Sequence, residues 1–268
     1  MKTSVIIVSY NSIDLLERCM RSVYANTSSS VEILVADNGS TDGSTDGVQS
    51  AFPKAVVIKL GSNLGFSKAS NAAARRAGGE YLVFLNPDTE VRTGALDYLA
   101  AFLDERKDAG IAGPRVVYPD NRFQVSAGGL PNLMREFRDR RMHQRMNAGD
   151  DALRAKVEKR FRGEREVGWV TGSCLAIRRN LFEELGGFDE GLFMYFEDKD
   201  LCKRAREKGW KAVFVPKAEV VHVLGGCAPP NEGARLRAVY RKSQQAYYKK
   251  HLGPLSNGIL RLYQAVSR

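Results

Sequence analysis

The stretch Glu80–Glu90, EYLVFLNPDTE, sets the tightest limit on how this chain can fold. Its apolar run, Tyr81–Leu85, is typical of a strand buried on both faces, as in a parallel sheet. The run ends abruptly in polar residues, and ligands of open α/β sheets bind beyond the carboxyl ends of the strands. Asp88 is therefore predicted to lie where a substrate or metal would bind, with Asn86 pointing the same way in an extended segment. The plainer alternative is a strand followed directly by a helix that starts at Thr93.

Length and composition fit one large globular domain, or one domain with an appendage. The chain has 268 residues, of which 43% are hydrophobic. No apolar run approaches the roughly 18 residues needed to span a bilayer, and the one at the N-terminus is too short for a signal peptide. The four cysteines form no CxxC pair, which argues against a zinc site or a disulfide framework and fits a reducing cytosol. We therefore expect a cytoplasmic protein.

The net charge of +10 is concentrated near the C-terminus. Residues 233–268 contain eight basic residues and no acidic one, and a second basic cluster runs from Arg135 to Arg145. Such segments indicate an anionic partner: a membrane surface, a nucleic acid or a phosphorylated substrate. The alternative is that these charges are the solvated faces of ordinary helices.

Strand and helix patterns alternate as βαββαβα over the first hundred or so residues. Strands are expected at Ser4–Val8, Val31–Ala36, Val56–Leu60 and Tyr81–Leu85, and the alternation predicts a mostly parallel sheet. Ser12 is expected to cap the first helix. Residues 119–165 are polar and basic, which predicts a mobile excursion with one or two helices. Further strands are expected at Trp169–Ile177, Ala212–Val215 and Glu219–Val223.

Residues 233–268 predict a tail of two basic amphipathic helices, split at Gly253-Pro254. Each helix has a face at helical spacing, formed by Leu236, Val239, Tyr240, Ser243 and Tyr247 in the first and by Ile259, Leu262, Tyr263 and Val266 in the second. We therefore divide the chain into a domain at 1–232 and a tail at 233–268. The tail is expected either to lie on an anionic membrane or to pack on the domain or on a second copy of the chain.

Acidic residues occur at the ends of three separate strands or loops, and a histidine occurs at the end of a fourth. They are Asp37, Asp88, the pair Glu197-Asp198, and His222. This oxygen-rich set with one imidazole suits Mg²⁺ or Mn²⁺ rather than zinc. Neither a P-loop nor the GxGxxG of dinucleotide-binding proteins is present, which disfavours both of those classes. A diphosphate held through a metal is the remaining way to bind a nucleotide.

Seven motifs in order give the chain a resemblance to a known family. They are VSYN (8–11), VADNGSTDGS (35–44), NLGFSKASN (63–71), FLNPDT (84–89), GSCLAIRR (172–179), GGFDEGLFMYFEDKDLC (186–202) and VVHVLGG (220–226). The set resembles the family 2 glycosyltransferases of the GT-A fold, and most of all their rhamnosyltransferase-like branch. The resemblance implies an α/β protein with a mostly parallel central sheet flanked by helices.

The resemblance also implies roles for individual residues. Asp37 resembles the residue that hydrogen-bonds the pyrimidine of the donor nucleotide, a role that suits a carboxylate because uracil and thymine present an N3–H. Asp88 resembles the last acid of the DxD motif, which binds metal and diphosphate, although Asn86 replaces the first acid. His222 resembles a histidine that completes the metal site. The nucleoside is expected to contact Tyr10, Asn11, Asn63 and Asn71.

By the same resemblance, Asp198 is the catalytic base of a single inverting displacement. Glu197 and Tyr195 are expected beside the acceptor or behind the base, and the alternative for Glu197-Asp198 is a helix N-cap. Phe193 and Phe196 are expected either to form an apolar wall for the acceptor sugar or to pack in the core.

The expected protein is a metal-dependent glycosyltransferase of surface polysaccharide synthesis. Its donor is a nucleoside diphosphate sugar, with dTDP-rhamnose favoured and UDP-galactofuranose or UDP-hexoses as alternatives. Its acceptor is a glycan, expected on a polyprenyl diphosphate, and no nucleic-acid partner is expected. The other classes considered are a sugar nucleotidyltransferase, whose Gly-rich basic opening loop is missing here, and an inactive nucleotide-sugar-binding subunit.

Overall fold

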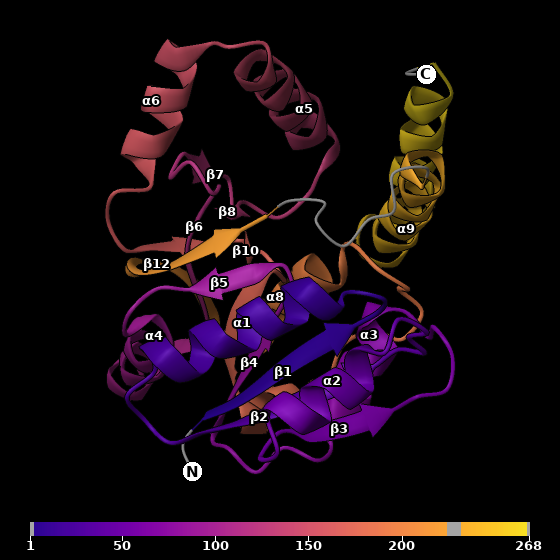
Figure 1. Ribbon diagram of the computed structural model, residues 1–268. Coiled ribbons are helices and arrows are strands. Elements are labelled where there is room, and N and C mark those ends of the chain that lie inside the picture. Colours follow the sequence, from indigo (N-terminus) through magenta and orange to yellow (C-terminus); the bar gives the residue numbers. More distant parts are fainter. Residues whose placement is uncertain (1–2, 224–231, 267–268) are drawn as a thin grey trace.

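The computed structural model describes residues 3–223 and 232–266. Its centre is a mixed sheet with strand order β3-β2-β1-β4-β11-β6-β12-β5 (Figure 1). The strands from β3 to β4 are mutually parallel, β11 is antiparallel to both its neighbours, and β6 is parallel to β12. Their bounds are β1 (Thr3–Ser9), β2 (Val31–Asp37), β3 (Val56–Lys59), β4 (Tyr81–Leu85), β5 (Thr89–Val91), β6 (Ala109–Val117), β11 (Cys174–Arg178) and β12 (Lys211–His222).

Helices cover both faces of this sheet, because side chains along each buried strand alternate between the two faces. On one face lie α1 (Ile13–Asn26), α2 (Ser44–Ala51) and α4 (Ala95–Glu105), which share one apolar cluster with the strands. On the other lie α3 (Phe66–Ala74), α7 (Arg179–Glu184) and α8 (Glu197–Glu207). The alternation is visible in β1, where Val5 and Ile7 enter the first cluster and Ile6 the second. The result is a three-layer α/β/α structure.

Helix α2 (Ser44–Ala51) and strand β5 (Thr89–Val91) are among the elements that the sequence patterns missed. Helix α2 follows β2, and it escaped notice because Val48 is its only buried apolar residue. Strand β5 follows the turn at Pro87-Asp88, so the segment after β4 is neither extended nor directly followed by a helix. The first helix also differs at its start. Ser12 Oγ bonds Ser9 Oγ, and the backbone N–H of Ile13 donates to Asp42 instead.

Two predicted strands are organised differently. The segment Trp169–Ile177 is split into β10 (Trp169–Val170) and β11 by a turn at 171–173, and β10 pairs with β8 (Ala127–Gly128) in a separate small sheet. The two strands expected at 212–223 are one strand, β12, with an irregularity between Val215 and Glu219. Short strands β7 (Phe123–Gln124) and β9 (Arg165–Val167) pair with β6 and β12.

The polar segment 119–165 contains the two helices at the top of Figure 1, α5 (Leu133–Asn147) and α6 (Asp151–Arg160). The tail is α9 (Gly233–Val266), broken at Gly253, whose φ of 81° no helix accommodates. The predicted break is therefore confirmed. The first predicted face is partly right, since Ser243 and Tyr247 are buried, but Gln244 and Tyr248 are buried with them.

The buried face of the second half of α9 is displaced by one residue from the prediction. Leu260 and Gln264 are buried, whereas Ile259 and Leu262 are exposed, because the helix docks with the side next to the predicted one. The side chain of Val266, together with Cys227, Arg268 and the end of the VVHVLGG motif, lies outside the described residues. In the part of the chain that the structure describes, no helix is long and apolar enough to cross a membrane.

Candidate active site

The carboxyl ends of β1 and β2 bring three of the predicted nucleotide-binding residues together. The two strands are parallel with Ser9 opposite Asp37, so Tyr10 and Asn11 leave the sheet beside the carboxylate. Asn11 has a φ of 48°, and its side chain accepts a hydrogen bond from the Thr41 backbone at 2.8 Å. Asp37 is buried and accepts from the Ser40 backbone at 3.0 Å. The loop after β2 is thereby held against the end of β1.

A second asparagine, Asn38, ties this loop to the one that follows β3. Its side chain donates to Asn63 Oδ1 at 3.0 Å and accepts from the Leu64 backbone at 2.8 Å. Asn38 is almost fully buried, and sequence reasoning did not single it out. Its position in the VADN motif, two residues after the strand's last apolar side chain, was the available signal. Asn63 is thus fixed near Asp37, and among the described residues its amide NH₂ has no hydrogen-bond partner.

The pairing of β5 with β12 brings Asp88 and His222 together. His222 lies opposite Thr89 in the antiparallel register, and the Val223 N–H donates to the Asp88 carbonyl at 2.9 Å. The side chains meet with His222 Nε2 3.2 Å from Asp88 Oδ1, and both are buried. Two residues some 130 positions apart in the sequence therefore form one polar pair at the end of β4, as the sequence predicted.

Gln124 on β7 orients the histidine ring, and sequence reasoning missed it. Its Oε1 lies 2.7 Å from His222 Nδ1, so Nδ1–H donates and Nε2 is left facing Asp88. Metal-binding histidines usually have their second nitrogen fixed in this way.

The chemistry of this pair fits a hard divalent cation. One carboxylate and one imidazole are available, and Mg²⁺ and Mn²⁺ take most of their remaining ligands from substrate phosphates and water. No cluster of three or more His, Cys, Asp and Glu that could hold a metal occurs within residues 3–223 and 232–266. Among the described residues, one carboxylate and one imidazole are therefore brought together here, and a bound diphosphate would supply further ligands.

The carboxylates Glu197 and Asp198 begin α8 after a strained turn. Tyr195 and Phe196 have φ values of 70° and 67°, a region that residues other than glycine rarely occupy. Asp198 is buried, and its Oδ2 accepts from the Gly172 backbone at 3.1 Å. Neither carboxylate caps the helix from its N-cap position, which Phe196 occupies. The turn thus presents both acids at the start of α8.

The two adjacent acids differ in their environments. Burial, together with the neighbouring charge of Asp198, raises the pKa of Glu197 to about 8. Its Oε2 is buried without a hydrogen-bond partner. Lys199 lies over the rings of Trp169 and Phe196. Burial opposes the charge of Lys199, but the carboxylate of Asp198 raises its pKa. A buried acid with a strongly shifted pKa beside a second acid is a common feature of active sites.

The side chain of Asn71 forms hydrogen bonds within the protein. Its amide donates to the Phe188 carbonyl at 2.9 Å and to Glu190, and its Oδ1 accepts from the Phe188 N–H at 2.9 Å. The neighbouring loop is held as well, because Phe66 N–H donates to the Phe193 carbonyl at 2.7 Å. Since these bonds occupy both amide hydrogens, we propose that Asn71 positions the aromatic loop, in place of the nucleoside contact expected from the sequence.

The aromatic residues before α8 divide between two environments. Phe196 is buried against Tyr247 of α9 at a ring distance of 5.6 Å, and Tyr195 stacks edge-on with Tyr240 at 5.5 Å. Phe193 is more than a third exposed. Of the three, Phe196 therefore packs in a core, and Phe193 is the one available to an acceptor.

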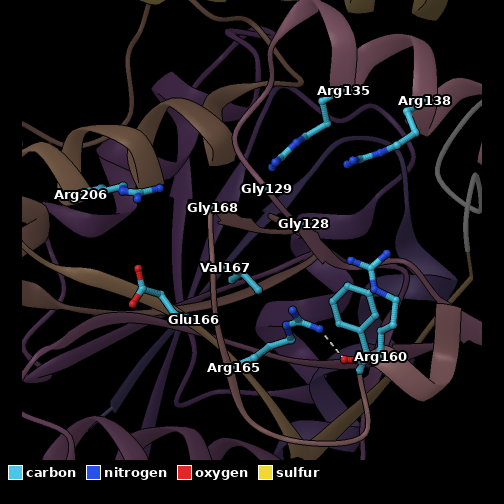
Figure 2. A pocket seen from close by; sticks show the side chains of 11 residues that line it. Gly128, Gly129, Arg135, Arg138, Arg160, Arg165, Glu166, Val167, Gly168 and Arg206 are labelled. Atoms are coloured by element: carbon cyan, nitrogen blue, oxygen red, sulfur yellow. Dashed lines mark hydrogen bonds between the residues drawn. The ribbon is translucent and has the colours of Figure 1, made fainter.

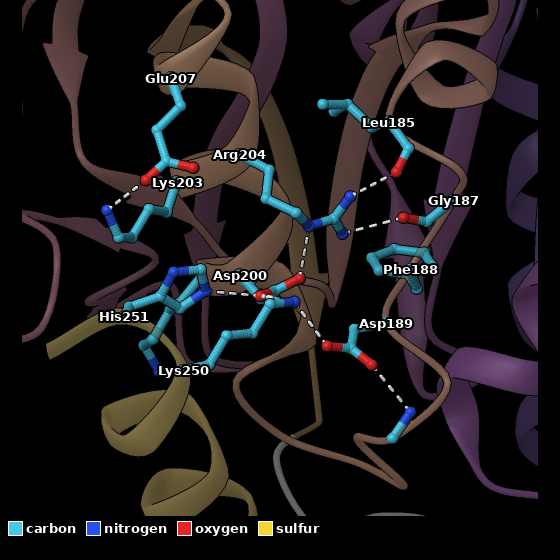
Figure 3. A network of polar contacts seen from close by, with 12 residues as sticks. Leu185, Gly187, Phe188, Asp189, Asp200, Lys203, Arg204, Glu207, Lys250 and His251 are labelled. Carbon is cyan, nitrogen blue, oxygen red and sulfur yellow. Dashed lines mark hydrogen bonds and ion pairs between the residues drawn. The ribbon is translucent and has the colours of Figure 1, made fainter. Parts of the chain in front are cut away.

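The buried Asp200 ties α8 to the tail (Figure 3). Its carboxylate contacts Arg204 at 2.7 Å, Lys250 at 2.8 Å and His251 at 2.7 Å. Arg204 also donates to the carbonyls of Leu185 and Gly187. Burial alone would raise the pKa of Asp200, but the His251 hydrogen bond and these cations hold that pKa well below its usual range. The first half of α9 is therefore fastened to the helix that begins with Glu197-Asp198.

Comparison with known proteins adds a family and a fold. The model of the family described as glycosyl transferase family 2 matches residues 4–186. An N-acetylglucosaminyl-diphospho-decaprenol L-rhamnosyltransferase of Mycobacterium tuberculosis is 32% identical over 93% of this chain and 85% of its own length. A dTDP-rhamnosyl transferase of Shigella flexneri is 25% identical over 64% of this chain, which spans about half of that protein, 53%.

Among solved structures, a mannosyltransferase of Pyrobaculum calidifontis in complex with GDP-Man and Mn²⁺ superposes with a TM-score of 0.64 at 19% identity. The alignment covers 94% of this chain and 64% of the mannosyltransferase chain. At that identity the likeness concerns the fold alone.

Proposed function

The chain belongs to glycosyltransferase family 2 and has the GT-A fold, and from this premise we propose that it transfers L-rhamnose from dTDP-rhamnose to a lipid-linked glycan. The observation that carries the proposal is the 32% identity, over 93% of the chain, to a rhamnosyltransferase whose name specifies a diphospho-decaprenol acceptor. UDP-galactofuranose and UDP-hexoses are the alternative donors.

In this proposal the donor nucleotide lies at the ends of β1 and β2. Asp37 accepts the N3–H of the pyrimidine, and Tyr10, Asn11 and Asn63 surround the nucleoside. The support is geometric: the Asp37 loop is fixed to Asn11 and Asn63 by side-chain hydrogen bonds through Thr41 and Asn38. A preorganised pocket of this kind lowers the entropy that donor binding costs.

Asp88 and His222 would hold a Mn²⁺ or Mg²⁺ ion, with Gln124 fixing the ring of His222. When bound, the ion neutralises the charge that develops on the departing diphosphate. Asn86, in the turn before Asp88, is half-buried, and its side chain forms no hydrogen bond within the described part of the chain. We propose that it lines the same diphosphate.

Asp198 acts as the general base of an inverting displacement. It takes the proton from an acceptor hydroxyl as that oxygen forms a bond to C1 of the donor sugar. The bond between C1 and the diphosphate oxygen breaks on the opposite face, and dTDP leaves. The Gly172 N–H, 3.1 Å from Asp198 Oδ2, holds the carboxylate in place. Glu197 and Tyr195 lie behind the base, where the protonated Glu197 adds no second negative charge.

We also propose that the protein works at an anionic membrane surface, where a polyprenyl diphosphate resides. The second half of α9 exposes Leu255, Ile259 and Leu262, which share one side at spacings of four and three residues. Arg261 is exposed between them. A second copy of the chain is the alternative occupant of this face.

The direct experiment is a donor screen with product analysis. The protein is incubated with a short-chain N-acetylglucosaminyl diphospholipid, Mn²⁺ and, separately, dTDP-rhamnose, UDP-galactofuranose and UDP-glucose. We expect dTDP release with a rhamnosylated lipid of inverted anomeric configuration. Turnover with a UDP-sugar only would overturn the donor assignment. Release of pyrophosphate would indicate nucleotidyl transfer, and no release from any donor would indicate a binding subunit.

A further inference from the structure

A cavity lined by five arginines lies outside the donor site. Its volume is about 330 Å³, and its cationic walls are Arg135, Arg138, Arg160, Arg165 and Arg206. Figure 2 shows Arg135 and Arg138 descending from α5, Arg206 entering from α8, and Arg160 and Arg165 on the side of α6 and β9. Glu166 is its only acidic lining residue, and Lys211 lies 4.0 Å from that carboxylate.

Four of the five arginines form no ion pair with any described residue. Within the described residues, the guanidinium groups of Arg135, Arg160 and Arg206 form no hydrogen bond or ion pair with a carboxylate, and Arg138 reaches only its chain neighbour Asp139 at 3.4 Å. Arg165 donates to the Arg160 carbonyl and lies over the Phe161 ring. Like charges gathered in one cavity repel one another, so this arrangement favours an anionic ligand. Guanidinium groups bind phosphate oxygens in pairs of hydrogen bonds.

Glycines form the floor of the cavity and bring the backbone close to the arginines. A β-carbon at Gly129 would lie 1.0 Å from Arg135 Nη1, and one at Gly168 would lie 2.1 Å from the Leu130 nitrogen. The Gly168 N–H donates to the Gly128 carbonyl at 2.6 Å, which joins the two floor segments. The absence of a side chain at Gly129 therefore lets the Arg135 guanidinium lie directly against the backbone of the cavity.

The cavity is one helix away from the proposed base. Asp198 is near the start of α8 and Arg206 near its end, about 12 Å apart at about 1.5 Å per residue. Trp169 lies between them, since it packs beside Gly128 of the floor and carries Lys199 on its ring. An acceptor with a hydroxyl at Asp198 and a diphosphate in the cavity would therefore have to span this distance along α8.

An apolar hollow adjoins the cavity and identifies the kind of anion. Met134 and Phe137 line it, and it shares Arg135 and Arg138 with the cavity. Met134 is 85% exposed, an unusual position for a large apolar side chain. A ligand with a diphosphate next to a hydrocarbon chain matches both hollows, whereas a nucleic acid or a free anion would leave the apolar one without a function.

We propose that the five-arginine cavity binds the diphosphate of the polyprenyl-linked acceptor, while Met134 and Phe137 contact the first isoprene units. The proposal rests on the lipid-linked acceptor of the proposed function. It gives a role to the basic excursion at 119–165, which supplies four of the five arginines.

Binding is tested first, without turnover. Calorimetry in the presence of a chelator gives the affinities of farnesyl diphosphate and of inorganic pyrophosphate. It is carried out with wild type, Arg135→Gln, Arg160→Gln and Met134→Ser. We expect each arginine variant to weaken both ligands about tenfold or more, and Met134→Ser to weaken farnesyl diphosphate only. Arg141→Gln and Arg162→Gln, exposed arginines of the same segments outside the cavity, serve as matched controls. Asp88→Ala, in the donor site, is expected to leave both affinities unchanged.

Kinetics then separates this site from the proposed function. With dTDP-rhamnose and an N-acetylglucosaminyl diphospholipid, Arg135→Gln is expected to raise the acceptor KM about tenfold and leave the donor KM unchanged. With an octyl glycoside acceptor, which has no phosphate, the same variant should match wild type. Equal losses on both acceptors, or pyrophosphate binding without any effect on the diphospholipid, would overturn the proposal. If wild type transfers no sugar but binds farnesyl diphosphate through these arginines, the proposed function fails and the lipid diphosphate site stands.

Discussion

At the scale of residues, two neighbouring acids at the start of α8 have different surroundings. Asp198 accepts a hydrogen bond from the Gly172 backbone, whereas Glu197 has a buried oxygen without a partner among the described residues and a pKa that burial raises to about 8. Enzymes commonly use such environments to give two carboxyl groups different tasks. An ionised Asp198 can accept a proton, and a protonated Glu197 keeps the repulsion between the two acids low.

Replacing Asp198 by asparagine tests the base. Asp198→Asn keeps the shape and removes the proton acceptor, so we expect kcat to fall by roughly 10²-fold or more. Binding of dTDP-rhamnose, measured by calorimetry, should be unchanged. Asp151→Asn, at an exposed site on α6, is the control. A near-normal kcat would move the role of base to Glu197.

Replacing Glu197 by glutamine tests the raised pKa through stability. The folded protein holds the Glu197 proton up to about pH 8, while the unfolded chain loses it near the ordinary pKa of 4.5. The folded state therefore loses stability as pH rises from about 4.5 to about 8. Glu197→Gln mimics the protonated acid, so urea unfolding should show a shallower decline for this variant across that window. Parallel curves for the two proteins would contradict the assignment.

At the scale of elements, pairing of short strands decides where side chains meet. Strand β5 has only three residues, yet its register with β12 brings His222 to Asp88, and β7 brings Gln124 to the ring. Metal affinity is therefore predicted to depend on three strands that are far apart in the sequence. Removing a residue that orients a metal ligand typically lowers affinity 10–100-fold.

The metal requirement gives the corresponding test. We expect Asp88→Ala to abolish activity and weaken donor binding. His222→Ala and Gln124→Ala should raise the Mn²⁺ concentration needed for half-maximal activity, Gln124→Ala by about tenfold. Asp120→Asn, in the exposed turn between β6 and β7, should match wild type. Full activity in chelator after both Asp88 and His222 are replaced would exclude the metal site.

The junction of α8 with α9 is a second element whose strength can be measured. Asp200 is fully buried among Arg204, Lys250 and His251, so Asp200→Asn leaves these cations without their carboxylate and is expected to cost about 3 kcal/mol of unfolding free energy. The matched control is Glu207→Gln. The carboxylate of Glu207 is exposed, so its pair with the half-buried Lys203 should contribute less than about 1 kcal/mol. Equal effects of the two substitutions in urea unfolding would contradict a structural role for Asp200.

At the scale of the whole molecule, the tail serves two purposes. Its first half packs Tyr247 and Tyr248 into an apolar cluster with Phe196, and Lys250 is paired with Asp189 and Asp200. Its second half exposes Leu255 and Leu262, at 78% and 72%. Deletion of residues 233–268 would therefore remove part of the core, and point variants are the better probe of a membrane surface.

Vesicle co-sedimentation tests the membrane proposal. We expect wild type to bind anionic but not neutral vesicles, and to bind less as salt rises. Leu255→Ser with Leu262→Ser should weaken binding without changing the unfolding free energy, because both side chains are exposed. Light scattering of wild type and of the same variants measures the oligomeric state. It tests the alternative that a second copy of the chain covers this face. A wild-type dimer that dissociates on these substitutions, with no vesicle binding, would assign the face to a second copy.

The sequence by itself determined the family, the α/β class, the order of most elements and the split at Gly253-Pro254. It could do so because these depend on local signals: buried apolar runs, glycine and proline positions, and polar strand ends such as Asn86-Pro87-Asp88. Asp88 and His222 were also paired correctly, but through the family resemblance.

Tertiary structure alone decided the contacts that no local pattern encodes. Strand β5 and helix α2 have too few apolar residues to be detected, and Gln124 and Asn38 matter only because pairing elsewhere brings them to His222 and Asn63. In the second half of α9 the buried residues are Leu260 and Gln264, each one position from the predicted face, although Tyr263 of that face does contact Phe137 and Arg140 of α5. The five arginines come from four elements. The sequence shows that these arginines are present, but only the fold brings them together around one cavity.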